Sequence, residues 1–342
     1  MSQTPEASRE ADRREGCAHP RDTFELLGHE RAERTVSAAM RGGRLHHAWL
    51  ITGAAGVGKA TFAYRMIRKL LGGRSLLPDG LDISANDPVS QRISAGAHGN
   101  LLVVRRPFDA RSKRLKTEIP VASIRALSEF FQETAAEEGR PRIGLIDKAD
   151  ELNASSENAV LKLLEEPPNG AVLILLADHP GRLLPTIRSR CVQLHLRGVP
   201  ETALRPWLGS QHGIGGELLG EVLWLSDGAP GQAVSWAADA EARRAVAQFA
   251  DALATGRAPS PALSASLAGP KSADSLALFW SGARKLLVEA ERGAWDAPYP
   301  EPRSGRAWSS VWRDALERER MIAELNTNTR VALMEFFAKA AA

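Results

Sequence analysis

Residues 48–59 read AWLITGAAGVGK, and this segment says more about the fold than any other. Its first five residues, Ala48–Thr52, are apolar enough on both faces to form a buried parallel strand. The next seven match the pattern G-x-x-x-x-G-K, and a helical pattern follows from Ala60. Glycines let such a loop turn its backbone N–H groups toward one anion, which the N-terminus of the next helix also attracts. The segment therefore predicts a phosphate-binding loop whose binding residues are Gly53, Gly56, Gly58 and Lys59.

Four more short apolar runs follow, and helical patterns lie between the runs. The predicted strands are 48–52, 101–105, 143–147, 172–177 and 192–196, and the predicted helices are 60–71, 121–137 and 154–165. Alternation of strands and helices predicts an α/β domain with an open parallel sheet and helices on both of its faces. After Arg197 the strand-like runs stop and the remaining pattern is helical. Within that region Trp308, Trp312 and Leu316 recur at helical spacing and predict a buried helix face.

Composition excludes several classes of protein. The 342 residues are 44% hydrophobic and 25% charged, which are ordinary values for globular domains. Two cysteines, Cys17 and Cys191, are too few for a disulfide framework or a four-cysteine zinc module, and one histidine, His98, cannot hold zinc alone. The formal charge, 44 − 41 = +3, does not by itself indicate nucleic-acid binding. We expect no membrane span, no secretory signal and therefore a cytoplasmic protein.

The positions that support hydrolysis in loops of this kind are altered. Ser or Thr normally follows the loop lysine and ligates Mg²⁺, but here that residue is Ala60. Thr61 lies about 100° further round the helix and cannot simply take over. Asp147 ends the strand run 143–147, as the acid on the metal side should. The next position, where a glutamate usually polarises water, is Lys148, which is protonated at neutral pH and cannot act as the base.

Further motifs give this order of elements a specific resemblance. Leu163–Pro168 read LLEEPP, Ser189-Arg190-Cys191 precede the last strand, and Leu45–Leu50 and Gly28-His29-Glu30 lie upstream of the loop. In this order the motifs resemble the AAA+ ATPases of the bacterial DNA polymerase III clamp loader. The resemblance implies an AAA+ P-loop domain with a parallel sheet, a small helical lid and a C-terminal all-helical collar domain. The expected boundaries are a disordered leader at 1–20, the α/β domain at 21–198, the lid at 199–240 and the collar at 241–342.

The resemblance also assigns a role to one arginine. In the family the arginine of the Ser-Arg-Cys motif reaches the ATP of a neighbouring subunit, and here that residue is Arg190. An arginine finger of this kind is worth about 10³–10⁵ in rate. The implied partners are the other AAA+ subunits of a hetero-pentameric clamp loader, the sliding clamp and primed DNA. The chain itself is expected to have no independent activity and to serve the DNA polymerase III holoenzyme as an accessory subunit.

Two more positions depart from the family pattern. Gly231 stands where related ATPases carry a sensor arginine, and Asp178 stands near the expected γ-phosphate, which it would repel. Both departures favour a subunit that does not hydrolyse ATP. They leave open whether ATP or ADP is bound without hydrolysis and whether Mg²⁺ is held, and no zinc is expected.

Alternatives stay open at this point. In an active ATPase of the same build, Thr61 would shift into the metal site, and Glu151 or Asp150 would act on water. In a pure scaffold subunit, nucleotide binding would be lost outright. A run of basic residues invites a DNA contact, but a solvated loop is favoured because only Phe108 could stack on a base. The run consists of Arg105, Arg106, Arg111, Lys113, Arg114 and Lys116.

Overall fold

The computed structural model resolves the chain into two compact units. One comprises Met1–Leu204 with Gly228–Gly231, and the other comprises Arg205–Asp227 with Gln232–Ala342. The structure describes residues 13–14, 16–43, 45–75, 77, 80–109, 114–133, 137, 139–269, 272–293, 295–304, 307–325 and 327–342. Most of the predicted leader, 1–12 and residue 15, therefore lies outside the described residues. The short 3₁₀ helix η2 (Pro20–Asp22) begins where that leader was expected to end.

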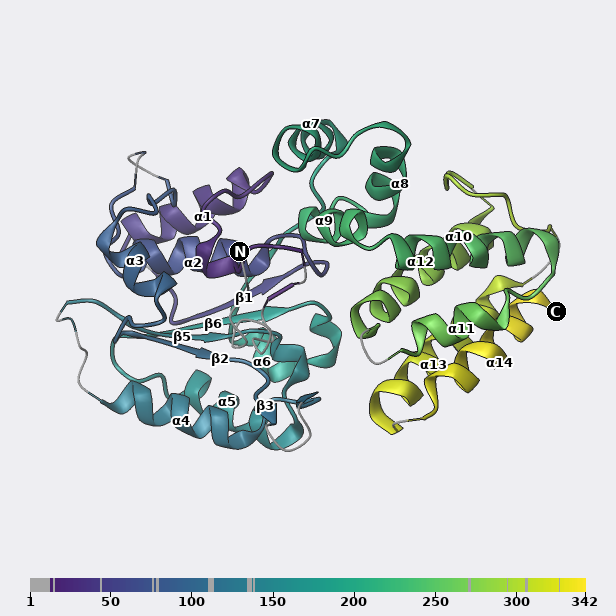
Figure 1. The fold of residues 1–342 in the computed structure, drawn as a ribbon. Coiled ribbons are helices and arrows are strands. Elements are labelled where there is room, and N and C mark those ends of the chain that lie inside the picture. Colours follow the sequence, from purple (N-terminus) through teal and green to yellow (C-terminus); the bar gives the residue numbers. More distant parts are fainter. Residues whose placement is uncertain are drawn as a thin grey trace. The chain divides into compact units, whose positions relative to one another are not determined.

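A five-stranded parallel sheet forms the centre of the first unit (Figure 1). Its strands are β1 (Ala48–Thr52), β2 (Leu101–Val104), β5 (Arg142–Ile146), β6 (Ala171–Ala177) and β7 (Val192–His195). Their order is β2-β5-β6-β1-β7, and every pairing is parallel. The strand before the glycine-rich loop thus lies between two neighbours, with Thr52 level with Ala177 on one side and with His195 on the other.

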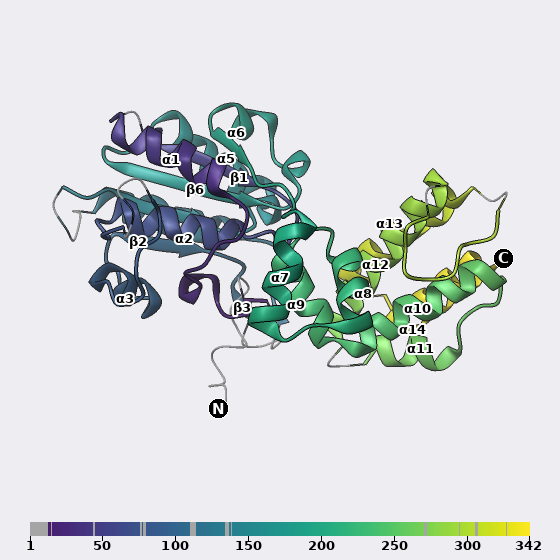
Figure 2. The same cartoon turned by 90° about the horizontal axis from the view of Figure 1, so that it is seen from above.

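Helices cover both faces of this sheet because successive strand residues point to opposite sides. Trp49 and Ile51 belong to a core shared with one set of helices, and Ala48 and Leu50 belong to the core on the other face. The first set is α1 (Glu30–Arg41), α2 (Lys59–Leu70) and α3 (Pro88–Ser94), which Figure 2 views from above. The second set is α4 (Val121–Gln132), α5 (Ala154–Glu165) and α6 (Pro185–Ser189). The predicted α/β fold class is confirmed.

Several local features differ from the sequence-based expectation. Helix α4 ends at Gln132 rather than at residue 137, and α1, α3 and α6 were not predicted. The basic segment includes a small antiparallel hairpin of β3 (Phe108–Asp109) and β4 (Arg114–Leu115). Arg111 and Lys113 lie outside the described residues. Two further 3₁₀ helices, η3 (Ala149–Glu151) and η4 (Pro180–Arg182), follow β5 and β6.

The second unit is helical, as expected for the C-terminal part. Its helices are α7 (Glu201–His212), α8 (Gly216–Ser226), α9 (Pro230–Ala238), α10 (Ala240–Thr255), α11 (Pro261–Leu267), α12 (Ala273–Arg292), α13 (Trp308–Leu325) and α14 (Thr329–Ala341), of which α7 and α9 begin in the first unit. A buried aromatic cluster joins three of them, with the rings of Phe249 on α10 and Phe336 on α14 stacked at 5.2 Å and Phe279 on α12 beside them. The finer division into a lid at 199–240 and a collar at 241–342 stays a prediction.

The prediction that Trp308, Trp312 and Leu316 form the buried face of α13 is wrong in part. Trp308 is buried, but Leu316 is 39% exposed, and the buried face continues through Val311 and Ala315 instead. A spacing of three and then four residues keeps side chains on one face, whereas two steps of four drift away from it. The sequence pattern had also favoured a loop over residues 258–270, where α11 is found.

None of the described helices combines the length and the apolar character that crossing a bilayer requires. Nor do three or more His, Cys, Asp or Glu side chains of the described residues gather as they would around a metal ion.

The glycine-rich loop has backbone geometry that other residues adopt poorly. Gly53 leaves β1 with φ +149°, and a Cβ atom there would collide with the carbonyl oxygen of Leu196. Gly58, the residue before α2, has φ +112°, and a Cβ atom there would lie 3.0 Å from Cδ1 of Leu26. The loop therefore depends on these glycines for its turn, whatever it binds.

Replacing Gly53 tests this requirement. We expect Gly53→Ala to lower the free energy of unfolding by about 2–3 kcal/mol, because both its φ and its clash with a backbone oxygen oppose a side chain. Gly170→Ala is the matched control, since Gly170 has φ +71° but open space around it. Chemical denaturation of both variants measures the difference, and equal losses would contradict the importance of the clash.

Candidate functional site

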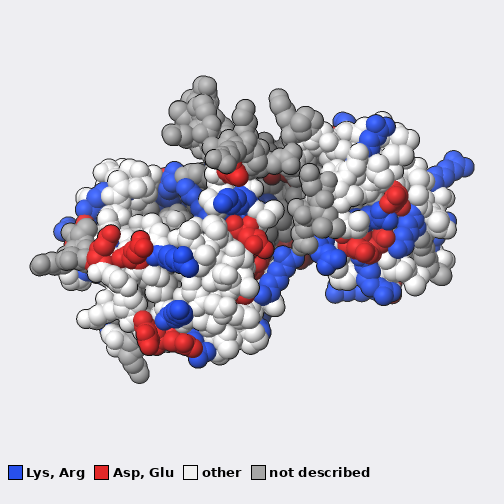
Figure 3. All heavy atoms as spheres, turned by 90° about the horizontal axis from the view of Figure 1, so that it is seen from below, with Lys and Arg blue, Asp and Glu red and all other residues white. Residues whose placement is uncertain are grey.

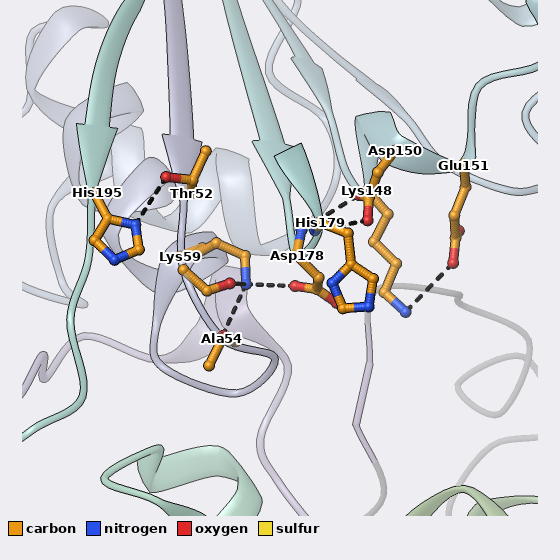
Figure 4. A network of polar contacts seen from close by, with 10 residues as sticks. Thr52, Ala54, Lys59, Lys148, Asp150, Glu151, Asp178, His179 and His195 are labelled. Atoms are coloured by element: carbon orange, nitrogen blue, oxygen red, sulfur yellow. Dashed lines mark hydrogen bonds and ion pairs between the residues drawn. The ribbon is translucent and has the colours of Figure 1, made fainter. Parts of the chain in front are cut away.

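The candidate site lies where the sheet's strands end, beyond the carboxyl ends of β1, β6 and β7 (Figure 4). Because Thr52 is level with Ala177 in the parallel register, the residues that follow them, Gly53 and Asp178, emerge side by side. On the other side, Oγ1 of Thr52 lies 3.0 Å from Nδ1 of His195. Strand register alone thus brings the start of the glycine-rich loop and an aspartate more than a hundred residues away to one edge.

Lys59 is fully engaged by protein oxygen atoms. Its Nζ donates to the carbonyl oxygen of Gly53 at 2.8 Å and to that of Ala54 at 2.9 Å. It also forms an ion pair with Oδ1 of Asp178. The side chain of Lys59 is only 8% exposed. An ammonium group has three N–H donors, and these three oxygens match that number.

Asp178 is held in its charged form by this arrangement. Burial is the largest single influence and opposes the charged form, but the charge and hydrogen bond of Lys59, together with smaller contributions from Lys148 and His179, outweigh it. The pKa of Asp178 is therefore below its ordinary value. The sequence predicts that this aspartate repels phosphate, but its pairing with the loop lysine depends on strand register and could not be read from local pattern.

A second aspartate fixes the backbone around Asp178. The carboxylate of Asp150, on η3, accepts hydrogen bonds from the backbone N–H of Asp178 at 3.3 Å and of His179 at 3.0 Å. This contact ties the segment after β6 to the segment after β5. Asp150 therefore has a positioning role that the sequence did not reveal.

Lys148 and Glu151 form a separate charged group at the same edge. Lys148 has φ +55°, and its Nζ lies 3.6 Å from Oε1 of Glu151. Glu151 also pairs with Nε of Arg106 at 2.7 Å. Burial raises the pKa of Glu151, as do Asp150 and Asp178 to a lesser degree, although Lys148 and Arg106 act in the opposite direction.

Gly231, where the family resemblance predicts the loss of a sensor arginine, lies against the loop itself. The backbone N–H of Gly231 donates to the carbonyl oxygen of Gly56 at 2.9 Å, and a Cβ atom at Gly231 would lie 3.1 Å from that oxygen. Sγ of Cys17 lies 3.7 Å from the Gly231 carbonyl oxygen. Nearby, Nε2 of His29 lies 2.8 Å from the carbonyl oxygen of Val57. The loop is thus tied to two other segments through its own backbone carbonyls.

The remaining predicted residues fit a metal–nucleotide group poorly. Ala60 and Thr61 lie in the first turn of α2, where Ala60 offers a methyl group at the usual metal position. Asp147 directly follows β5, and one strand, β6, lies between β5 and the loop strand β1. With Lys59 already coordinated by three oxygens, this donor set does not fit Mg²⁺ with a nucleoside triphosphate in the usual way.

Arg190 lies at the other edge of the sheet. It caps the C-terminus of α6, directly before β7, so it sits near the amino ends of the strands. Its Nη2 pairs with Oε1 of Glu165 at 2.9 Å, and its Nη1 donates to the carbonyl oxygen of Thr186 at 3.1 Å. The side chain remains 38% exposed. Burial raises the pKa of the neighbouring Cys191 thiol to about 12, so this cysteine stays neutral and serves packing.

The segments that carry Arg190 are fixed by polar contacts of α5. The side chain of Asn153 caps this helix by accepting from the backbone N–H of Ser156 at 2.9 Å. Oε1 of the buried Glu157 accepts from the backbone N–H of Leu184, the residue before α6, at 3.1 Å. Helix α6 is therefore anchored to α5, the helix that also provides Glu165.

Two solved structures align with most of this chain, at low TM-score and low identity. One is a DNA polymerase III gamma-subunit-related protein of Thermotoga maritima, with a TM-score of 0.43, 16% identity and coverage of 91% of this chain and 98% of that chain. The other is the RuvB Holliday junction branch migration motor of Thermotoga maritima, with a TM-score of 0.42, 15% identity and coverage of 94% and 91%.

Sequence comparison finds nearer relatives. The DNA polymerase III subunit delta' of Pseudomonas aeruginosa is 36% identical over 192 residues, which are 55% of this chain and 56% of the relative. That of Escherichia coli is 31% identical over 198 residues, 58% of this chain and 56% of the relative. The subunit tau of Salmonella typhimurium is 32% identical over 240 residues, 69% of this chain and 34% of the relative. The chain spans about half the length of the delta' relatives it matches.

A family model described as "DNA polymerase III, delta subunit" matches residues 28–200, which are more than half of the 342 residues. This range holds the glycine-rich loop, Asp178 and Arg190, the residues on which the site is built. The motif order had pointed, within the clamp-loader family, to delta-prime subunits, and the family match and the two delta' relatives confirm that resemblance. The chain belongs to the DNA polymerase III delta subunit family and is similar to its delta-prime members.

Proposed function

We propose that the chain is a non-hydrolysing, delta-prime-like subunit of a cytoplasmic clamp loader of DNA polymerase III. In this role it supplies Arg190 in trans to ATP held by a neighbouring AAA+ subunit of a hetero-pentamer, which loads the sliding clamp onto primed DNA. The observation that carries the proposal is the placement of Arg190 and Lys59 at opposite edges of one sheet.

Strand geometry explains why this placement matters. Arg190 precedes β7 and the loop follows β1, and these strands pair in parallel from Trp49–Val192 to Thr52–His195. Four to five strand residues span about 15 Å at roughly 3.3 Å each. An arginine finger must contact the phosphate that it stabilises, so Arg190 is poorly placed to serve the loop of its own chain. An exposed arginine at the amino edge suits a site on another subunit.

The contacts of Arg190 suit a donor as well. A guanidinium carries five N–H donors in a rigid fork, and the contacts with Glu165 and Thr186 engage its two terminal nitrogens. These contacts hold the group in one orientation while over a third of the side chain stays exposed. Preorganised, permanently positive groups are what the charge of a phosphoryl-transfer transition state requires.

The active-ATPase alternative lacks comparable support. Asp150, one candidate base, accepts two backbone hydrogen bonds and so serves to position the segment after β6. Glu151, the other candidate, pairs with Arg106 and Lys148. Thr61 follows Ala60 within α2, so its hydroxyl group is one residue beyond the position that usually ligates Mg²⁺. The scaffold alternative without nucleotide binding gains support from the pairing of Lys59 with Asp178.

Direct DNA binding by the basic segment is not part of the proposal. Arg106 is paired with Glu151, and Arg111 and Lys113 lie outside the described residues. On the face drawn in Figure 3, basic and acidic side chains of the described residues are interspersed. A mixture of both signs is typical of a solvated surface rather than of a phosphate-binding one.

Removing Arg190 tests the donor role. In a loader reconstituted with its sister subunits, we expect Arg190→Ala to reduce ATP turnover at least tenfold, on the order of 1.4 kcal/mol or more in barrier height, with the complex still assembled. Arg182→Ala is the matched control because Arg182 is an exposed arginine on η4. Turnover that stays at the wild-type level with Arg190→Ala would assign this residue a structural role.

Glu165 should act by positioning Arg190. The pair is largely exposed, so its strength is discounted to about 0.5–1 kcal/mol, and we expect Glu165→Gln to reduce sister-subunit turnover by about 2–5-fold. Glu166→Gln changes the adjacent exposed acid and should leave turnover unaffected. In an Arg190→Ala background the Glu165→Gln change should have no effect, and independent, additive losses would contradict positioning.

Lys59 is expected to matter for stability rather than for loader turnover. Lys59→Ala leaves the carboxylate of Asp178 unpaired and mostly buried, so we expect a loss of about 2–4 kcal/mol in the free energy of unfolding. Lys59→Ala/Asp178→Ala removes both charges and should recover part of that loss. Loader turnover with folded Lys59→Ala should stay near wild type, and a loss as severe as that of Arg190→Ala would contradict the proposed role.

A further inference from the structure

The strongest unexplained feature outside the donor arginine is the internal anion at the glycine-rich loop. Lys59 is the residue that should reach a nucleotide's terminal phosphates, yet its ammonium is coordinated by two loop carbonyls and by Asp178. Lys59 is 8% exposed and Asp178 17% exposed, so both charges are largely removed from water. A charge pair with this degree of burial is hard to separate, because separation leaves each partner poorly solvated.

The position of Asp178 is set by the backbone of the sheet and not only by the rotamer of its side chain. It is the first residue after β6, and β6 is paired in parallel with the loop strand β1 along its length. The two N–H hydrogen bonds that Asp150 accepts fix the backbone of Asp178 and His179 in this place. Figure 4 shows the carboxylate of Asp178 directed at Nζ of Lys59 from the neighbouring strand end.

The loop is constrained from within as well. The backbone N–H of Val57 donates to the carbonyl oxygen of Ala54 at 3.2 Å, so one N–H of the loop serves the loop itself. The carbonyl of Gly56 accepts from Gly231, at the position where an arginine would have offered a positive charge. Phosphate binding by such a loop relies on convergent N–H donors and a reachable lysine.

We propose that Asp178 decides what the loop accepts: its carboxylate takes the place of a nucleotide phosphate on Lys59 and closes the loop to nucleoside triphosphates. A triphosphate would have to displace Asp178 and then lie beside the carboxylate it had released. Ala60 provides no hydroxyl ligand for the Mg²⁺ that would otherwise screen this repulsion. The loop is thus a self-paired structural element, and its lysine is neutralised by the chain's own residue.

This role of Asp178 rests on the proposed function only for the premise that the site does not hydrolyse ATP. It predicts that removing the Asp178 carboxylate increases the affinity of the chain for triphosphates. The full chain is titrated calorimetrically with ATP, with ATP plus Mg²⁺, and with inorganic triphosphate. We expect Asp178→Asn and Asp178→Ser to bind these probes about tenfold or more tighter than wild type, because the competing charge is gone and Lys59 is released. Lys59→Ala/Asp178→Asn should lose the gained affinity.

A matched control separates local pairing from general charge. Glu151→Gln removes one negative charge at the same edge of the sheet without touching Lys59, and it should leave the affinity at the wild-type level. Two results would overturn the proposal: wild-type chain that binds ATP as tightly as the Asp178 variants, or folded Asp178→Asn and Asp178→Ser that gain nothing. If the asparagine variant does not fold, the serine variant and the wild-type titration still decide. Sister-subunit turnover with Arg190→Ala tests the proposed function separately, so either idea can fail alone.

Discussion

The parallel pairing of β1 with β6 is the constraint on which the rest of the site depends. It places the residue after each strand at one edge, so that the loop beginning at Gly53 meets Asp178. An ammonium and a carboxylate so placed, and so little exposed, stabilise one another against the cost of leaving water. Helices on both faces of the sheet bury every residue of β1, and the core on one of these faces includes residues of α2, the helix that begins with Lys59.

The charged residues at the carboxyl ends of the strands (the carboxyl edge) and at their amino ends (the amino edge) are paired in different ways. At the carboxyl edge, the charges of Lys59, Lys148 and Glu151 are each met by a partner from the same chain. At the amino edge, Arg190 is paired through Glu165 yet still open to solvent. Charges at the carboxyl edge are thus neutralised within the chain, whereas the arginine at the amino edge is exposed. A subunit that supplies an arginine to a neighbour and does not itself hydrolyse ATP would need this arrangement.

Much of the fold was readable from the sequence, while the central contact of the site was not. The run Ala48–Thr52 matches β1 to the residue, because a buried strand next to a glycine-rich turn is a purely local signal. The pairing of Lys59 with Asp178 joins positions far apart in the chain and depends on strand order, which no local pattern states. Helix α13 shows a smaller failure of the same kind, since tertiary packing chose Val311 and Ala315 over Leu316 for the buried face.

A loop lysine that is buried without a phosphate needs another anion beside it. When the chain itself supplies that anion, the loop can keep its glycines and its lysine even though Ala60 and Lys148 stand where a metal ligand and a catalytic glutamate are usual. Gly53 and Gly58 are required by the turn from β1 into α2 regardless of any ligand, because both have positive φ angles and a Cβ atom at Gly53 would also collide with a backbone oxygen. Lys59 then lies at the carboxyl ends of the strands with its charge, and Asp178 of the same chain compensates that charge. The glycine-rich pattern alone is therefore evidence for a fold, whereas the partner of its lysine decides whether that fold also binds nucleotide.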